Sequence, residues 1–266
     1  MTVNNTSPQI GRFSNVDASQ EAEQFVAFLE RIERLPAAGE LRERSYELLD
    51  AGEGSMVVDV GCGTGRVVDD LAGRGIKAIG VDISEQMIAV ARQRFPNRDF
   101  RLAAAESLPF EDDVLDRYRA ERLYQHLKDP VRALAEARRV LAPGGRIVLV
   151  DQDYDMWAID ADDEAITRAL MRAQSDMITN RWIGRRYHNL LLDAGFVDVV
   201  VEVQTGIYTE YAQVGAVLPS IANAGVAAGT VTREQADAWL AEQERRGREG
   251  RFFEAMPLFL ASGRRP

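Results

Sequence analysis

A glycine-rich turn between a buried strand and a helix is the feature that most restricts the fold of this chain. The apolar run VVDV leads into Gly61, Gly63 and Gly65, and a helix is expected at 66–72. Glycine lets a ligand approach the backbone closely, and the N–H groups that begin a helix can bind an anion. Asp82 ends the next expected strand, 21 residues after Gly61, where its carboxylate can accept hydrogen bonds from both hydroxyls of a ribose. The arrangement predicts a site for a nucleotide-like ligand.

The glycine spacing argues against two common nucleotide loops. A dinucleotide-binding loop has the pattern G-x-G-x-x-G, whereas here the pattern is G-x-G-x-G and Arg66 follows. A Walker A loop ends in G-K-[ST], which the sequence lacks. A tight turn without a ligand is the bland alternative, although three alternating glycines are a costly way to build one.

Strands and helices alternate along the chain, which predicts an α/β fold with a mainly parallel sheet and helices on both faces. Apolar runs predict strands at 56–60, 77–82, 99–104, 114–120, 146–151, 197–205 and 252–263. Helical spacing predicts helices at 20–35, 37–50, 66–72, 84–95, 129–141, 184–194, 210–228 and 232–247. A further helix is expected after the acidic stretch that follows residue 151, and it ends at about residue 180. Ser84 and Asp129 are the expected N-caps of two of these helices. Pro257 favours an edge position or a bulge for the last strand.

Charge and cysteine content exclude several classes of protein. The 266 residues include 32 Lys and Arg against 42 Asp and Glu, a net charge of −10, which disfavours nucleic-acid binding. Cys62 is the one cysteine, so a disulfide framework and a cysteine-rich zinc site are excluded. The sequence has no apolar run of about 18 residues and no signal-peptide core at its polar start. We expect a cytoplasmic protein that binds neither nucleic acid nor membranes.

Four motifs in order resemble those of class I S-adenosylmethionine-dependent methyltransferases. They are DVGCGTG at 59–65, VD at 81–82, SLPF at 107–110 and RVLAPGG at 139–145, and the resemblance covers about 50–205. The chain is similar to the small-molecule branch, which includes ubiquinone/menaquinone-type and natural-product enzymes. The resemblance implies a Rossmann-like sheet of seven mainly parallel strands. It also implies S-adenosylmethionine as cofactor and S-adenosylhomocysteine as product.

The resemblance further suggests one domain over residues 1–266. Residues 1–52 would form an N-terminal arm and helical cap, 53–205 the cofactor-binding core, 206–250 a helical lid between strands six and seven, and 251–266 the final strand. A minimal enzyme of this family joins strands six and seven by a short hairpin, so the lid is an addition. We expect a monomer or a homodimer.

The family's motifs suggest where the cofactor binds. The methionine part would be lined by the acidic residue of the first motif and its loop, namely Asp59, Gly61, Cys62, Gly63 and Gly65. Asp82 would hold the ribose, and Ile83 and Met87 would pack on the adenine.

Two further stretches have candidate cofactor residues. Relatives often carry an Asp that meets the adenine amino group, and Ala104 stands there in this chain. Adenine would then depend on backbone groups at Ala104 and Ala105, or on Glu106. After the fourth strand, Glu121 and Arg122 are candidates for the cofactor's amino-acid end, with a solvated charge pair as the alternative. Arg44 could reach the cofactor carboxylate, although a plain surface arginine is the preferred interpretation.

Methyl transfer needs a base where the acceptor must lose a proton, and two residues are candidates. His126 follows the fourth strand at the carboxyl edge of the sheet, where ligands bind in open α/β folds; the alternative is a histidine bonded to backbone. Asp151 follows the fifth strand at the same edge, with Asp153 and Asp155 beyond it, and a solvated acidic loop is the alternative for at least two of these. His188 is expected to pack or face solvent. We expect no metal, because the end of the fourth strand supplies no clear Asp ligand.

The acceptor site is expected after the fifth strand, where all three tryptophans lie. Ligand pockets are mainly apolar and aromatic, so Tyr154, Trp157 and Trp182 are candidates to line it under the helical lid. The alternative is that such aromatic residues form only the core of the lid, and for Trp239 this alternative is preferred. The acidic stretch 151–164 favours a neutral or cationic acceptor.

The sequence therefore predicts methyl transfer from S-adenosylmethionine to a small-molecule acceptor by in-line displacement. An oxygen of a specialised metabolite is the first choice of acceptor, and nitrogen and carbon remain open. A second hypothesis is a natural-product enzyme of the same fold that catalyses cyclisation or decarboxylation instead. The G-x-G-x-G spacing and the RVLAPGG motif disfavour a nicotinamide oxidoreductase.

Overall fold

A single twisted sheet organises the computed structural model, which describes residues 31, 33 and 35–266. The expected helix at 20–35 therefore lies almost entirely outside the described residues. The strands are β1 (Met56–Val60), β2 (Lys77–Asp82), β3 (Asp99–Leu102), β4 (Leu115–Glu121), β5 (Leu141–Gln152), β6 (Ala158–Ile159), β7 (Val197–Tyr208) and β8 (Glu254–Arg264). All seven expected strands are found, and the two-residue β6 is an addition.

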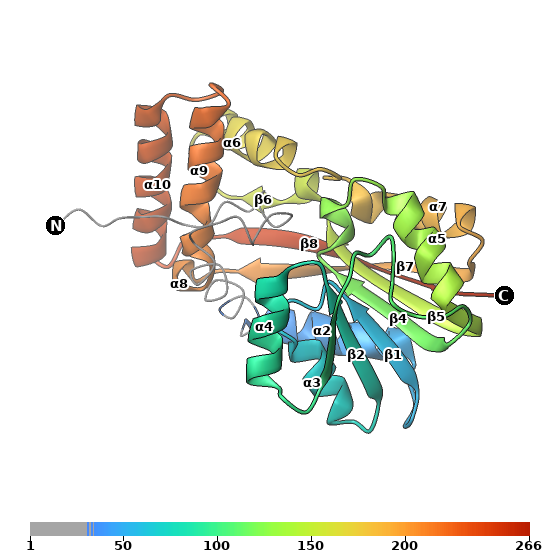
Figure 1. Ribbon diagram of the computed structural model, residues 1–266. Coiled ribbons are helices and arrows are strands. Elements are labelled where there is room, and N and C mark those ends of the chain that lie inside the picture. Colours follow the sequence, from blue (N-terminus) through green and yellow to red (C-terminus); the bar gives the residue numbers. More distant parts are fainter. Residues whose placement is uncertain (1–30, 32, 34) are drawn as a thin grey trace.

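The strand order is that of a Rossmann-like sheet with an antiparallel end. The order runs β3-β2-β1-β4-β5-β8, and β7 and β6 both pair with β8 (Figure 1). The first five strands are mutually parallel, and β8 is antiparallel to its three neighbours. The predicted fold class is confirmed.

The expected edge position of Pro257 is wrong, because β8 lies inside the sheet. Pro257 pairs with Thr205 of β7 on one side. On its other side β5 pairs only from Leu258 onward, and β6 pairs only with Glu254 and Ala255. The proline thus falls in the gap between two pairing partners, where its missing N–H breaks no ladder with either of them.

Helices cover both faces because alternate strand residues point to opposite sides. On one face, α2 (Pro36–Leu49) and α3 (Arg66–Ala72) pack with Val57 of β1, and α4 (Glu85–Arg94) packs against α3. On the other face, α5 (Pro130–Val140) and α7 (Ile183–Asp193) pack with Val58. Both expected N-caps are confirmed: Ser84 accepts from the Met87 N–H at 3.2 Å and Asp129 from the Arg132 N–H at 3.0 Å.

A group of helices stands beyond one end of β7 and β8 (Figure 1). It consists of α6 (Glu164–Asp176), α8 (Tyr211–Val214), α9 (Leu218–Ala227) and α10 (Arg233–Arg248). Leu170, Leu218 and Trp239 form part of its apolar core, which also includes Trp157 and Tyr208. The Trp239 indole N–H donates to Thr167 Oγ1 at 3.0 Å, so Trp239 has the expected packing role. Three single-turn 3-10 helices, η2 (Tyr124–His126), η3 (Tyr154–Met156) and η4 (Gly215–Val217), complete the structure.

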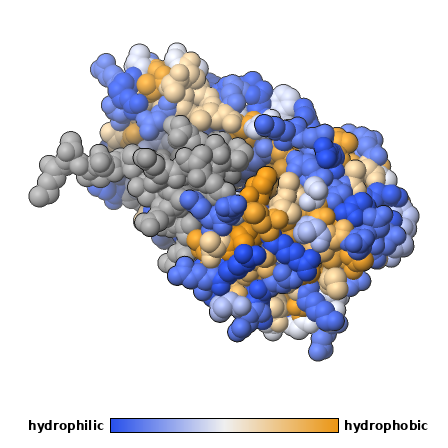
Figure 2. Space-filling view, viewed as in Figure 1, coloured by the Kyte–Doolittle hydropathy of each residue, from blue (hydrophilic) through white to orange (hydrophobic). Residues whose placement is uncertain are grey.

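The face of the molecule shown in Figure 2 is mostly hydrophilic, with a band of hydrophobic residues across its middle. Among the described residues, no helix combines the length and the apolar character needed to cross a membrane.

Candidate active site

A cavity of about 890 Å³ opens at the carboxyl ends of the parallel strands. Its cofactor half is formed by α2, the glycine loop after β1, the end of β2, and Ala103, Ala105 and Glu106. Its acceptor half is formed by residues from η2, the region 152–157, the end of β7, the 214–217 region and β8. These residues are Gln125, His126, Gln152, Tyr154, Trp157, Gln204, Thr205, Tyr208, Val214, Val217, Met256 and Leu258.

The glycines of the loop serve different purposes. Gly63 lines the cavity with φ +50°, and a Cβ added there would meet nothing within 4 Å, so the space beside it is open. Gly61 also lines the cavity. Gly65 does not, and a Cβ there would come within 2.6 Å of the Phe100 ring. The loop therefore leaves room for a ligand at Gly63, whereas Gly65 allows close packing behind it.

Asp82 is held in a defined orientation at the end of β2. Its Oδ2 accepts from the Gly63 N–H at 2.9 Å, and its Oδ1 accepts from the Ser84 N–H at 2.9 Å. The carboxylate thus ties the glycine loop to the start of α4 while lining the cavity. A carboxylate at this point suits the two hydroxyls of a ribose.

The expected adenine residues lie mostly beside Asp82. Ile83 is 65 % exposed and lines the cavity together with the buried Met87 and Ala105 and the partly exposed Glu106. Ala104 does not line the cavity, and its carbonyl accepts from the Ser107 N–H at 3.1 Å. An apolar surface beside a ribose-binding carboxylate and an open glycine loop fits the nucleoside of the expected cofactor.

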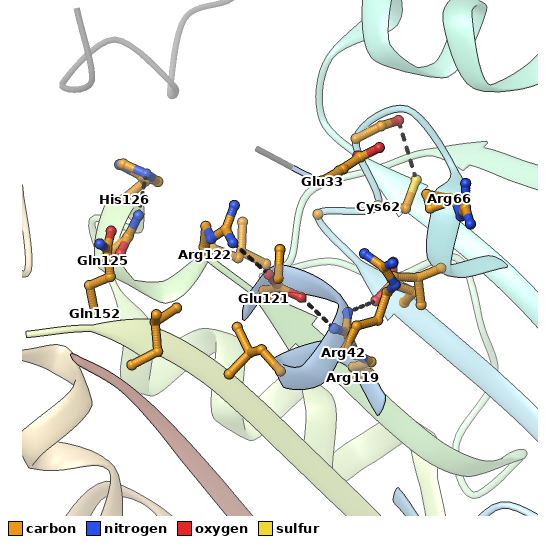
Figure 3. A pocket seen from close by; sticks show the side chains of 18 of the residues that line it. Glu33, Arg42, Cys62, Arg66, Arg119, Glu121, Arg122, Gln125, His126 and Gln152 are labelled. Carbon is orange, nitrogen blue, oxygen red and sulfur yellow. Dashed lines mark hydrogen bonds and ion pairs between the residues drawn. The ribbon is translucent and has the colours of Figure 1, made fainter. Parts of the chain in front are cut away.

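A row of alternating charges runs along the cavity wall. Arg119 of β4 pairs through Nη1 with Asp59 Oδ1 at 2.9 Å and through Nη2 with Glu121 Oε2 at 2.5 Å. Its Nε donates to Ser45 Oγ at 2.9 Å. Arg122 Nη2 then contacts Glu121 Oε1 at 3.2 Å. Figure 3 shows Arg119, Glu121 and Arg122 joined in this row.

Burial and pairing act in opposite directions on the two acids of this row. Burial raises the pKa of Asp59 to about 6, against the opposing effect of Arg119. Burial would also raise the pKa of Glu121, but Arg122 and Arg119 outweigh it and hold that pKa below its usual range. Glu121 is therefore a fixed anion on the cavity wall.

Two arginines of the site were not predicted from the sequence. Arg119 is fully buried opposite Asp59 in the β1–β4 register, and a signal existed, because a charge inside a buried strand requires a partner. Arg42 of α2 lines the cavity, with its Nε 3.2 Å from Asp70 Oδ2. Arg44 points away instead and binds Glu202 through two hydrogen bonds of 2.8 and 2.5 Å.

His126 lines the acceptor half, and burial lowers its pKa to about 4. Its Nε2 lies 2.9 Å from Gln125 Nε2. Figure 3 shows His126, Gln125 and Gln152 grouped at one end of the site. The imidazole is therefore neutral at pH 7 and a weak base. His188 is outside the cavity, with its Nδ1 3.2 Å from Asn189 Oδ1.

Asp151 does not line the cavity and is fully buried. The Tyr187 hydroxyl donates to one oxygen and the Gln125 N–H to the other, the latter at 3.4 Å. Burial raises its pKa to about 7. Its geometry is that of a group that holds the η2 turn, and it does not reach the acceptor half.

The three expected acceptor residues do not lie together. Tyr154 and Trp157 are buried and line the acceptor half, with ring centroids 6.3 Å apart. Trp182 is not on the cavity wall, and its indole N–H donates to Asp155 at 2.7 Å. Tyr208 lines the wall as well and was not among the sequence candidates.

The acidic stretch 151–164 contributes no carboxylate to the cavity wall among the described residues. Asp153 pairs with Arg185, Asp160 and Asp162 pair with Arg246, and Asp163 caps α6. The basis for a preference for cationic acceptors is therefore lost. No group of three or more His, Cys, Asp or Glu residues that could hold a metal is present in the described part of the chain.

Comparisons with known proteins agree with this geometry. Residues 58–149 match the family model of a methyltransferase domain. Over 244 residues the chain is 35% identical to an uncharacterized 37.1 kDa protein in transposon TN4556 of Streptomyces fradiae, covering 88% of this chain and 70% of that protein. It is 38% identical over 128 residues to methyltransferase GfsG of Streptomyces halstedii, a match that spans less than half of either chain (45% and 46%).

The fold has solved counterparts that hold the expected cofactor. Phosphoethanolamine N-methyltransferase 2 of Haemonchus contortus, in complex with S-adenosyl-L-methionine, matches with a TM-score of 0.62 at 17% identity, over 94% of this chain and 59% of that one. The sequence motifs, the domain match and the shared fold agree. The chain contains a methyltransferase domain at residues 58–149 and has the fold of the class I S-adenosylmethionine-dependent methyltransferases.

Proposed function

We propose that this protein transfers a methyl group to an oxygen atom of an uncharged, mainly apolar small molecule. The observation that carries this proposal is the continuity of one cavity between the Asp82 region and the aromatic wall formed by Tyr154, Trp157 and Tyr208. Pockets for small molecules are typically apolar and aromatic with a few placed polar groups. The three glutamines of the acceptor half, Gln125, Gln152 and Gln204, supply such polar groups without a net charge.

Residues of the cofactor half would hold the cofactor by complementary charge. Asp82 would accept from the ribose hydroxyls, and Ile83 would cover the adenine. Asp59 and Glu121 would hold the ammonium group, and Arg42 would suit the carboxylate. When bound, S-adenosylmethionine supplies an electrophilic methyl group on a sulfonium.

Residues of the acceptor half would orient the acceptor and exclude water. Positioning of this kind contributes up to about 7–11 kcal/mol to a displacement between two bound groups. His126 stays neutral and serves as a hydrogen-bonding group rather than as a strong base. The helical group of α6, α8, α9 and α10 acts as a lid, because Val214 and Val217 reach the wall from it.

The function is tested with methyl-labelled S-adenosylmethionine and matched alcohols, phenols and amines that share an apolar body. We expect label on oxygen, identified by mass spectrometry, together with S-adenosylhomocysteine. Label found only on the amines would contradict the choice of oxygen. Cofactor binding without S-adenosylhomocysteine formation on any acceptor would favour the non-methylating hypothesis.

Changing Asp82 to Asn is expected to weaken S-adenosylhomocysteine binding by about 10- to 150-fold, because hydrogen bonds to a charged group contribute about 1.5–3 kcal/mol. Isothermal titration calorimetry measures the change. Asp69→Asn is the matched control, because Asp69 lies on α3 outside the cavity and pairs with Arg98 at 3.0 Å. Equal affinities of the two variants would remove Asp82 from the cofactor site.

A further inference from the structure

The acceptor half of the cavity carries little charge. The carboxylates that line the cavity are those of Glu33, Glu40, Asp59, Asp82, Glu106 and Glu121. They lie in the cofactor half: just before α2, on α2, near the ends of β1, β2 and β4, and in the loop before Ser107. Among the described residues, the wall from 152 to 258 contributes apolar, aromatic, amide and hydroxyl groups. A charged acceptor would find no counter-charge on that wall.

Arg122 is a cation at the junction of the two halves, and Lys128 also lines the cavity. It directly follows β4 and lines the cavity, and Figure 3 shows it between Glu121 and the group formed by Gln125, His126 and Gln152. Burial raises the pKa values of Tyr154 and Tyr208, and the charge of Arg122 opposes that rise at both residues. The guanidinium therefore acts on two hydroxyls of the acceptor wall.

The backbone of Arg122 is held in an unfavourable conformation. Its φ is +53°, and the other non-glycine residues with positive φ in the described part of the chain are all aspartates, which tolerate this region better. The left-handed conformation costs an L-residue such as Arg about 1–2 kcal/mol. The Arg122 N–H donates to the Val150 carbonyl at 2.7 Å, which holds the turn in place. Strain retained beside a cavity is typical of functional positions.

The side chain of Arg122 has donors left for a ligand. Glu121 Oε2 lies 2.5 Å from Nη2 of the buried Arg119, and only Oε1 contacts Arg122, at 3.2 Å from its Nη2. A guanidinium has five N–H donors. Among the described residues, Glu121 is the one polar partner of the Arg122 guanidinium. The remaining donors can bind an oxyanion in the cavity.

We propose that Arg122 binds the reacting oxygen of the acceptor as an anion, so that the acceptor is an apolar molecule with an acidic hydroxyl, a phenol or an enol. This inference rests on the proposed function. On binding, the O–H bond breaks, its electron pair stays on oxygen, and the proton passes to bulk water. No protein base is needed, which agrees with the weak basicity of His126. A neighbouring arginine lowers the pKa of an acid by about 1–3 units.

Other titratable groups surround the same space. Glu121 pairs with Arg122, and His126, Lys128 and Tyr154 line the cavity. The charge of Asp151 acts on Tyr154, and Glu254 is paired with Tyr208 in the β7–β8 register. Comparing variants that keep all of these groups isolates the effect of Arg122.

The test uses 4-nitrophenol, whose phenolate absorbs visible light and whose neutral form does not. The protein is saturated with S-adenosylhomocysteine, and the apparent pKa of the bound probe is read from an absorbance titration. We expect the wild type to lower that pKa by one to two units. Arg122→Asn, which tolerates positive φ, should raise that pKa back by one to two units, which leaves at least about tenfold less phenolate at a pH well below the wild-type value, and Arg122→Lys should keep most of the wild-type shift. Arg132→Asn makes the same change at an exposed position of α5 and should match the wild type.

The outcomes separate this inference from the proposed function. S-adenosylhomocysteine binding is measured by calorimetry for each variant, and its absence in the wild type would overturn the proposed function. Where it is intact, an apparent pKa of the bound probe in Arg122→Asn that equals the wild-type value overturns only the role of Arg122. Wild type that binds the probe as the neutral phenol, or fails to bind it, also overturns that role.

Discussion

Replacing Arg119 by methionine is expected to lower the free energy of unfolding by about 3–5 kcal/mol, because it leaves buried carboxylates without their partner. Arg119 is 1 % exposed and holds both Asp59 and Glu121. Methionine keeps an unbranched apolar side chain but has no charge, so Asp59 must remain ionised without a counter-charge or take up a proton, and Glu121 keeps only its contact with Arg122. Urea unfolding at pH 7, followed by circular dichroism, measures the change.

Two further variants make this prediction specific. Arg98→Met breaks an ion pair whose side chains are about one-third exposed, and such pairs contribute about 0–1 kcal/mol. Ser45→Ala keeps both ion pairs of Arg119 and removes the hydrogen bond to its Nε, together with the bond that Ser45 Oγ donates to the Arg42 carbonyl, at a cost of about 1 kcal/mol for each bond. The expected order of destabilisation is Arg119→Met well above the other two. A loss below 1 kcal/mol for Arg119→Met would mean that the buried row contributes nothing to stability.

Glu254 is expected to make the protein less stable as the pH rises from 5 to 8. It is fully buried, its Oε1 accepts from the Trp157 indole N–H at 3.1 Å, and its Oε2 has no hydrogen-bond partner. Burial raises its pKa from 4.5 to about 8. The folded state therefore keeps a proton that the unfolded state loses above about pH 4.5. The stability that Glu254 contributes is complete below that pH and falls by about 1.4 kcal/mol per pH unit until about pH 8.

Glu254→Gln removes this titration and keeps an oxygen that can accept from Trp157. The quantity to measure is the difference in unfolding free energy between wild type and variant at pH 5, 6, 7 and 8, because Asp59, Asp151 and His126 titrate in both proteins and cancel. We expect the difference to move in favour of the variant as the pH rises. Since Arg44 lowers the pKa of Glu202, Glu202→Gln should show its pH-dependent difference only below about pH 4.5. A flat difference for Glu254→Gln over pH 5–8 would contradict the prediction.

The elements of the core could be predicted because local patterns determine them. The expected strands at 56–60 and 77–82 match β1 and β2 residue for residue, since a buried apolar run ends there at a glycine loop or an acidic residue. Ser84 and Asp129 begin their helices as expected, because N-caps act over only three residues. The four sequence motifs identified the cofactor half of the cavity for the same reason, because each of them is a local pattern.

Features that depend on how distant segments meet were not predictable. Arg119 became visible as a site residue only in the β1–β4 register, where it faces Asp59. Arg42 and Arg44 lie two residues apart on α2 and face different directions. The orientation of α2 about its axis determines that Arg42, and not Arg44, lines the cavity. Trp157 and Trp182 both follow the fifth strand, and the sequence does not distinguish their roles. In the structure, a hydrogen bond to Asp155 holds Trp182 away from the cavity wall. The charge of the stretch 151–164 is neutralised by partners as far along the chain as Arg246.

The interior position of β8 has a consequence for the order of events during synthesis. β8 pairs with β5, β6 and β7, and all three emerge from the ribosome before it. Until residues 254–264 have been made, β5 has an open edge and β7 has no partner in the sheet. Synthesis proceeds at about 5–20 residues per second, and segments translated earlier can begin to fold during that time. The acceptor wall cannot close at this stage, because Met256 and Leu258 belong to β8. The nascent chain therefore passes through a stage in which its apolar strand edges are exposed.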